Sequence, residues 1–174
     1  PGEDSRLTEL GCRQAIAAAQ TLEAESITVI YSGTAPRARQ TAELLATTLA
    51  TTWGTPGPRI TAIPELIEVA VTAEMLRSWV VEQDLGQRVA DGDAEGETGQ
   101  QVVDRVTAAF QKIASTHPGE TVAVVGHVAS LTVALERICS LGSGVWGTPL
   151  PHALPFLVEW DGHAWRCPAW PALG

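Results

Sequence analysis

The stretch Thr121-Val-Ala-Val-Val-Gly-His-Val-Ala-Ser-Leu-Thr-Val-Ala-Leu135 decides the fold of this chain. Residues 121–125 are apolar or β-branched without interruption, which predicts a short strand buried on both faces, as in a parallel sheet. Residues 128–135 are rich in apolar side chains at positions suited to a packed helix. The strand therefore turns into a helix at Gly126 and His127.

A strand-to-helix turn of this kind is a common place for a ligand. In open α/β sheets, ligands bind at the carboxyl ends of the strands. There His127 would lie beside helix-terminal N–H groups, which favour an anion. A histidine that merely caps the turn explains an isolated Gly-His equally well, so the rest of the chain has to decide between these interpretations.

The length, hydrophobic content and net charge limit the class of protein and the partners that it can bind. A chain of 174 residues suits one domain, and 45% hydrophobic content is ordinary for a soluble globular protein. No run approaches the roughly 18 apolar residues that span a bilayer, and we expect neither a leader peptide nor a membrane partner. The net charge of −9 disfavours nucleic acids, because their phosphates would be repelled. A small anionic substrate remains compatible, since local arginines can build a positive pocket.

The cysteines indicate a reducing compartment. Cys12, Cys139 and Cys167 are too few and too scattered for a disulfide framework or a zinc site. We expect them to be reduced thiols in a cytoplasmic protein.

Helices and strands are expected to alternate along the chain. Thr8 is the expected N-cap of the first helix, and Pro36 lies just ahead of another. An acidic, Gly-containing excursion is expected over residues 84–96. We predict helices over residues 8–25, 37–45, 73–83, 97–116 and 128–135, strands over 27–31, 59–63 and 121–125, and a terminal hairpin of 156–160 with 164–167. This alternation indicates a parallel α/β sheet covered by helices on both faces.

Charged side chains at two further turns are candidates for chemistry. Residues 32–39 again run from strand end to helix start and carry Arg37 and Arg39. Arginine suits bidentate binding of a phosphate or carboxylate, but residues two apart diverge on a helix, so only one can easily point into a crevice. Two solvated arginines explain an isolated Arg-x-Arg as well. Glu68 follows an apolar pair and would need burial to act as a general acid, whereas most loop glutamates are simply solvated.

Taken together, these segments resemble the histidine phosphatase superfamily, the phosphoglycerate-mutase-like fold. The matching segments stand in the family's order and span nearly the whole chain. They are residues 7–15 for L-T-x-x-G-x-x-Q-A, 37–42 for R-A-x-Q-T-A, 66–68 for L-x-E, 96–98 with Arg105 for G-E-S/T and its downstream R-V, and 124–127 for the strand-end histidine.

The resemblance implies a three-layer α/β/α sandwich around a mostly parallel sheet. It also implies phosphoryl transfer from a small phosphomonoester through a phosphohistidine. Arg37 would bind the phosphate and Arg39 would point outward, His127 would hydrogen-bond the phosphate, and Glu68 would protonate the leaving oxygen. No metal or other cofactor is implied, because imidazole and guanidinium groups stabilise the charge. A phosphatase is expected rather than a mutase, since the long insertions of cofactor-dependent mutases have no room; a homodimer remains an open alternative.

The family's first motif, Arg-His-Gly at the end of a central strand, is not found in the chain. It carries the nucleophilic histidine and belongs before Leu7, where only residues 1–6 stand. Each of the four histidines of the chain lies outside such a motif: His117, His127, His152 and His163. Losing a central strand would orphan buried backbone groups at about 1–3 kcal/mol each. We therefore expect residues 1–174 to be one N-terminally incomplete histidine-phosphatase-like domain.

Two other functions are considered for this sequence. The main alternative is a catalytically silent module of the same fold that binds a phosphorylated ligand or a partner protein. A serine hydrolase is disfavoured, because residues 126–130 are not the Gly-x-Ser-x-Gly elbow. Ala-Val-Thr at residues 70–72 replaces the glycine-tryptophan segment that usually follows L-x-E in the family. The family pattern therefore does not indicate which residues of this chain contact the leaving group.

Overall fold

The computed structural model describes residues 4–69, 97, 99–145 and 150–171 of the chain. These residues form two compact units. The first comprises the residues up to Ile67 with Lys112–His127 and His152–Pro155, and the second comprises the rest. The helix expected over residues 73–83, the acidic excursion over 84–96 and the altered segment 70–72 lie outside the described residues.

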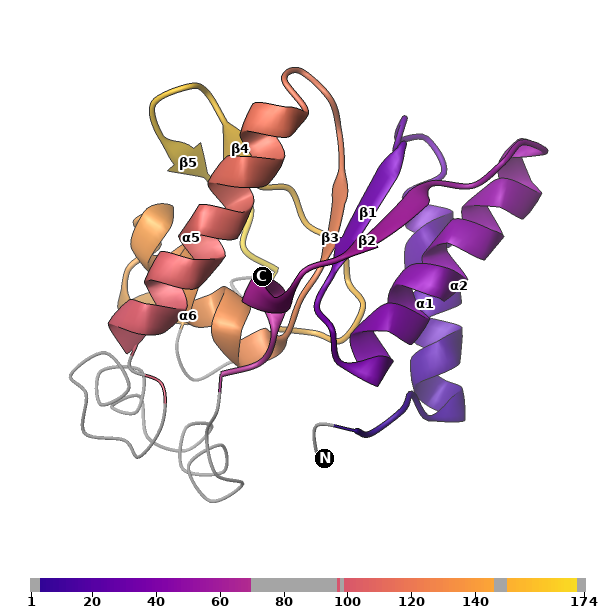
Figure 1. Ribbon diagram of the computed structural model, residues 1–174, viewed down its shortest axis with the longest axis horizontal. Helices are drawn as coiled ribbons and strands as arrows, with labels where there is room; N and C mark the ends of the chain where they lie inside the picture. The colour runs from indigo at the N-terminus through magenta and orange to yellow at the C-terminus, as the bar shows by residue number, and fades with distance from the viewer. Residues whose placement is uncertain (1–3, 70–96, 98, 146–149, 172–174) are drawn as a thin grey trace. The chain divides into compact units, whose positions relative to one another are not determined.

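The first unit is built on a three-stranded parallel sheet (Figure 1). Its strands are β1 (Val29–Ser32), β2 (Arg59–Ala62) and β3 (Ala123–Val125), in the order β2-β1-β3. The register places Ser32 beside Ala62 and Val125, so the three strands end together at one edge. The three predicted strands are thereby confirmed; each is shorter than predicted, and β1 ends one residue later than predicted, at Ser32.

Strand β3 is less buried than its composition predicts. Ala123, Val124 and Val125 are all only half-buried, whereas we expected a strand buried on both faces. Among the described strands β3 pairs with β1 alone, so it forms the edge of the sheet. An edge strand exposes the side of its backbone that has no neighbour, and a run of apolar residues cannot reveal that position.

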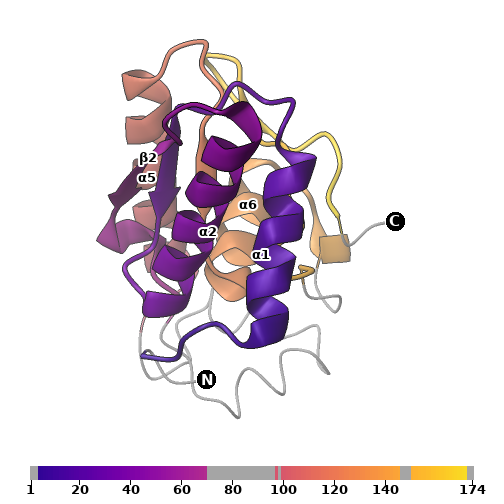
Figure 2. The same ribbon diagram turned by 90° about the vertical axis from the view of Figure 1, so that its right-hand side faces the viewer.

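Two helices of the first unit pack side by side (Figure 2). They are α1 (Glu9–Thr21) and α2 (Pro36–Trp53). Thr8 caps α1 as expected: its hydroxyl oxygen accepts the Gly11 N–H at 3.1 Å. Pro36 occupies the first position of α2, where its missing N–H costs no hydrogen bond.

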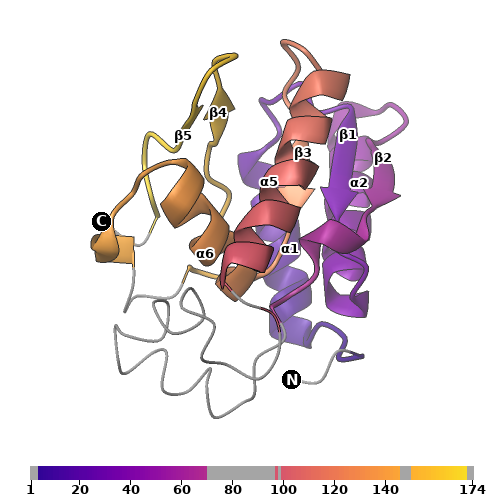
Figure 3. The same ribbon diagram turned by 60° about the vertical axis from the view of Figure 1, so that its left-hand side comes forward.

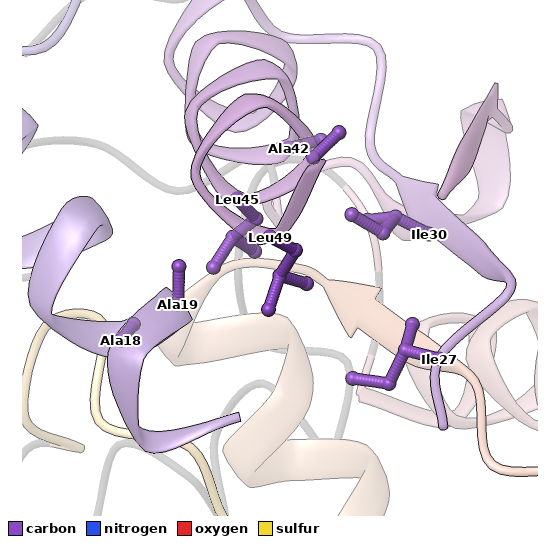
Figure 4. Close-up of a cluster of buried hydrophobic side chains, with 8 residues drawn as sticks. Ala18, Ala19, Ile27, Ile30, Ala42, Leu45 and Leu49 are labelled. Carbon is purple, nitrogen blue, oxygen red and sulfur yellow. The ribbon is translucent and has the colours of Figure 1, made fainter. Parts of the chain in front are cut away.

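A compact apolar cluster holds α2 against the sheet and α1 (Figure 4). Leu45 and Leu49 come from α2, Ile30 from β1, and small alanines line α1, so the two helices can approach closely. The cluster comprises Ala18, Ala19, Ile27, Ile30, Ala42, Leu45, Ala46 and Leu49. It thereby holds α2 against β1 and α1.

The predicted helices of the second half are also present. They are α5 (Gly99–Thr116), whose last turn belongs to the first unit, and α6 (Val128–Ile138). The face of α5 expected to be buried is buried: Val102, Val106, Ala109, Phe110 and Ile113. Short 3₁₀ turns η1 (Pro64–Leu66) and η2 (Ser143–Val145) complete the helical elements of the described residues.

The terminal hairpin is confirmed but short (Figure 3). Its antiparallel strands are β4 (Glu159–Trp160) and β5 (Trp165–Arg166). The Trp165 ring meets Phe110 of α5 edge-on, with centroids 5.4 Å apart, and this contact ties the hairpin to the helix.

Candidate functional site

The carboxyl edge of the parallel sheet brings two predicted turns together. β1 and β3 are neighbours, and the Gly33 N–H donates to the Val125 carbonyl at 3.0 Å, directly beyond the paired residues. The chain leaves β1 through a short loop into α2, and it leaves β3 through Gly126 and His127 into α6. This is the place in a parallel sheet where ligands are expected.

The imidazole of His127 is held tightly at this edge. The residue is only 7% exposed. A Cβ built on Gly33 would lie 3.3 Å from His127 Nε2 and 2.6 Å from the Leu66 carbonyl oxygen, so only a residue without a side chain leaves both neighbours undisturbed. The Ile63 N–H donates to the Ser32 carbonyl at 2.8 Å and brings the turn after β2 to the same place. The turns that follow all three strands therefore meet around His127.

Arg37 lies in the first turn of α2 and is half-buried, whereas Arg39 is exposed. The difference has the direction expected for an inward and an outward arginine. The N-cap residue is Ala35, which has no side-chain acceptor for the first N–H groups of the helix. The positive end of the helix and the guanidinium group of Arg37 together favour an anion here. A phosphate contact of Arg37 itself stays a prediction.

In the second unit Glu68 is not a solvated loop residue. Its Oε1 accepts the Ser130 N–H at 2.8 Å and the Ser130 hydroxyl at 2.9 Å, and its Oε2 accepts the Ala129 N–H at 3.3 Å. The carboxylate therefore caps the N-terminus of α6, where the helix dipole favours a negative charge. Ala129 and Ser130 follow His127 by two and three positions in the chain.

A second carboxylate and an arginine extend this arrangement. Glu97 and Arg105 form a two-pronged ion pair, with Nε to Oε1 at 2.5 Å and Nη2 to Oε2 at 2.8 Å. Arg105 Nη2 also donates to the Ser130 hydroxyl oxygen at 3.2 Å. Sequence reasoning matched Glu97 and Arg105 only as a motif, and it considered Ser130 only as a rejected hydrolase nucleophile. The signal that could have singled out Ser130 is its position in the first turn of the helix that follows His127.

His117 belongs to a different place in the first unit. Its Nε2 lies 3.0 Å from the Tyr31 hydroxyl, and its Nδ1 lies 3.1 Å from Glu120 Oε2. His117 precedes β3 and His127 follows it, so the two histidines are at opposite ends of this strand. His152 and His163 are exposed.

The described residues include no group of three or more histidine, cysteine, aspartate or glutamate side chains that could hold a metal ion. Within the same described ranges, no helix has both the length and the apolar character needed to cross a membrane.

Known proteins share both the sequence pattern and the fold of this chain. The family model of the histidine phosphatase superfamily (branch 1) matches residues 1–172. A metal-independent phosphoserine phosphatase of Arabidopsis thaliana is 30% identical over 151 residues, which are 80% of this chain and 61% of that protein. The chain thus spans about three fifths of the length of that curated relative.

Among solved structures, Bacillus stearothermophilus YhfR is similar with a TM-score of 0.75 and 26% identity, covering 95% of this chain and 84% of its own. A mycobacterial glucosyl-3-phosphoglycerate phosphatase in complex with VO3 shares the fold with a TM-score of 0.73 at 21% identity, covering 97% of this chain and 88% of its own. These similarities confirm the predicted α/β fold with a mostly parallel sheet flanked by helices. Because the family model matches almost the whole chain, the protein belongs to the histidine phosphatase superfamily, branch 1.

Proposed function

We propose that this chain forms the phosphate-binding and proton-donating part of a phosphatase that hydrolyses small phosphomonoesters through a phosphohistidine. The observation that carries the proposal is the meeting of the His127 turn and the start of α2 at one sheet edge, with Gly33 against the His127 ring. The names of the relatives, phosphatases of phosphoserine and of glucosyl-3-phosphoglycerate, support a small phosphorylated substrate.

Each proposed role follows from the chemistry of its side chain. Arg37 binds two phosphate oxygens, and His127 donates a hydrogen bond to a third. As the ester P–O bond breaks, a P–N bond to the nucleophilic imidazole forms, and the leaving oxygen takes a proton from the Glu68 carboxyl. Water then attacks the phosphorus as the P–N bond breaks, and a proton from this water restores the Glu68 carboxyl while the imidazole and inorganic phosphate are released.

The scheme also requires a nucleophilic histidine. None of the four histidines in the chain stands in an Arg-His-Gly motif. We propose that the nucleophilic histidine enters on a further strand that pairs with the outer edge of β3. The residues of β3 are half-buried, and a parallel strand added at its outer edge would end about 5 Å from the end of β3, beside His127. Without such a strand the chain would bind a phosphorylated ligand without hydrolysing it, which is the second candidate function.

Location and partners are also proposals. Free thiols at all three cysteines are in keeping with a cytoplasmic protein. The negative net charge of −9 favours a small substrate over a nucleic acid, because only a local positive site can attract phosphate.

The first experiment measures orthovanadate binding to the chain by calorimetry. Arg37→Met should weaken binding by about 10- to 100-fold, the worth of a hydrogen-bonded charge pair. The matched control, Arg39→Met, removes an exposed arginine from the same helix and should leave the affinity within about twofold. Equal losses from the two variants would remove Arg37 from the phosphate site.

The second experiment tests turnover. The chain alone should form no acid-labile phosphohistidine with a phosphomonoester. The same chain extended at Pro1 by an apolar strand ending in Arg-His-Gly should form it and hydrolyse the substrate. Stoichiometric phosphohistidine in the chain alone would show that another histidine is the nucleophile. An extended chain that binds vanadate but never turns over would establish the silent module instead.

A further inference from the structure

The hydroxyl group of Ser130 lies between a guanidinium group and a carboxylate in the second unit. It is 3.2 Å from Arg105 Nη2 and 2.9 Å from Glu68 Oε1. A guanidinium group can only donate hydrogen bonds, so the Ser130 oxygen has to accept from Arg105. An ionised carboxylate can only accept, so the hydroxyl proton points towards Glu68. The two neighbours therefore set the direction of this hydroxyl group.

The guanidinium group is itself fixed in place. Both prongs of its ion pair with Glu97 are made, and the two side chains are only 17% and 22% exposed. A bidentate pair fixes the plane of the guanidinium group as well as its position. From this fixed position Arg105 Nη2 donates to the Ser130 hydroxyl oxygen, and the Ser130 hydroxyl donates to Glu68 Oε1.

The two oxygens of Glu68 differ as a result. Oε1 accepts from the Ser130 N–H, from the Ser130 hydroxyl and from the Val69 N–H at 3.0 Å. One carboxylate oxygen offers about two lone-pair positions, so Oε1 is fully used as an acceptor. Oε2 accepts one longer bond, from Ala129 at 3.3 Å. A proton on the carboxyl group is therefore accommodated on Oε2.

We propose that Ser130 and Arg105 are positioning residues that orient the Glu68 carboxyl group so that Oε2 carries and donates the proton. This inference rests on the proposed function, in which Glu68 protonates the leaving oxygen. Neither positioning residue is assigned a contact with the substrate; each acts through the carboxyl group of Glu68.

The variants separate orientation from packing. Ser130→Ala removes the hydroxyl group, and Ser130→Thr keeps one. Thr132→Val is the matched control, because Thr132 is a buried residue of the same helix whose hydroxyl donates to the Val128 carbonyl at 2.8 Å. Arg105→Met is made together with Glu97→Gln, so that no buried carboxylate is left without a partner.

The first measurement needs no enzymatic activity. Infrared spectra of the chain with ¹³C-labelled glutamate, with the Glu68→Gln spectrum subtracted, report the carboxylate stretches of Glu68. Unequal hydrogen bonding of the two oxygens should separate the asymmetric and symmetric stretches differently in the native chain and in Ser130→Ala. Ser130→Thr and Thr132→Val should match the native chain. An unchanged separation in Ser130→Ala would overturn the positioning role whatever the activity.

The second measurement uses the extended chain with the Arg-His-Gly strand and two substrates. With an alkyl phosphate, whose leaving oxygen needs a proton, Ser130→Ala should lower kcat by about 10- to 100-fold, part of the worth of a general acid. With 4-nitrophenyl phosphate, whose leaving group needs no proton, the loss should stay within about threefold, and KM should hold for both. The double Arg105 and Glu97 variant should show the same selectivity. In a Glu68→Gln background, Ser130→Ala should have no further effect, because both act through one carboxyl group.

Equal losses on the two substrates, or a loss that persists in the Glu68→Gln background, would overturn the inference. Its failure is distinguishable from failure of the proposed function. If the extended chain forms no phosphohistidine, the proposed function fails together with the proton-donating part of this inference. The infrared change would still support the orientation of Glu68 by Ser130.

Discussion

Replacing Leu49 by alanine should destabilise the first unit strongly. Leu49 is 0% exposed and packs in the cluster that joins α2 to β1 and α1 (Figure 4). A buried leucine truncated to alanine typically costs 2–5 kcal/mol of unfolding free energy, made up of about 0.8 kcal/mol per lost methylene-sized group plus a cavity term. The cluster that contains Leu49 also contains several alanines, such as Ala19 and Ala42, whose single methyl groups have no rotamers with which to fill the space. We therefore expect a loss in the upper part of that range, about 3–5 kcal/mol.

Urea unfolding followed by circular dichroism measures this loss. With a urea dependence of about 2 kcal/mol per molar, the midpoint should fall by roughly 2 M. The expected loss of about 3–5 kcal/mol is a large part of a domain stability of about 5–15 kcal/mol. Thr47→Ala is the matched control, because Thr47 is exposed on the same helix, and it should change the free energy by at most about 0.5 kcal/mol. A cost below about 1 kcal/mol for Leu49→Ala, or an equal cost for Thr47→Ala, would refute this account of the packing.

Three further outcomes are expected. Burial raises the pKa of Cys139 from 9.0 to about 11. At pH 8 this thiol should therefore react with iodoacetamide about 100-fold more slowly in the folded protein than in the urea-unfolded protein. Mass spectrometry of the labelled peptide measures both rates, and equal rates would contradict the prediction. Thr8→Ala should cost about 1 kcal/mol in the same unfolding assay, because it removes the acceptor for the Gly11 N–H; no change would mean that the cap is not formed in solution. In the extended chain Glu68→Gln should lower kcat for an alkyl phosphate by about 10²–10⁴-fold. Glu65→Gln, at a glutamate that is half-buried like Glu68, should lower it only slightly. A larger loss from Glu65→Gln would assign the acid role to Glu65.

Local features could be predicted because they depend on residues a few positions apart. The N-cap at Thr8, the start of α2 at Pro36 and the buried face of α5 all follow from hydrogen bonds and periodicities within one or two helical turns. The parallel sheet and the common edge at which its strands end were predictable for a related reason, since strands that alternate with helices can pair only in a few ways. His127 and Arg37 could be named as candidates because each follows a strand at this edge; the choice of phosphate-binding roles over a capping histidine and a solvated arginine came from the resemblance to the histidine phosphatase superfamily, and those roles stay predictions.

Only the tertiary structure decided what surrounds Glu68. Its donors at positions 129 and 130 are about sixty positions away along the chain, and no spacing in the sequence relates a loop carboxylate to the first turn of a distant helix. The same holds for the chain of contacts from Glu97 through Arg105 to Ser130, and for the position of β3 at the edge of the sheet that the described strands form. Hydrogen bonds between side chains depend on distances and angles in space, and these are set by how whole elements pack. The residue pattern therefore named Glu68 as a candidate acid, which stays a prediction, but not the groups that hold its carboxylate.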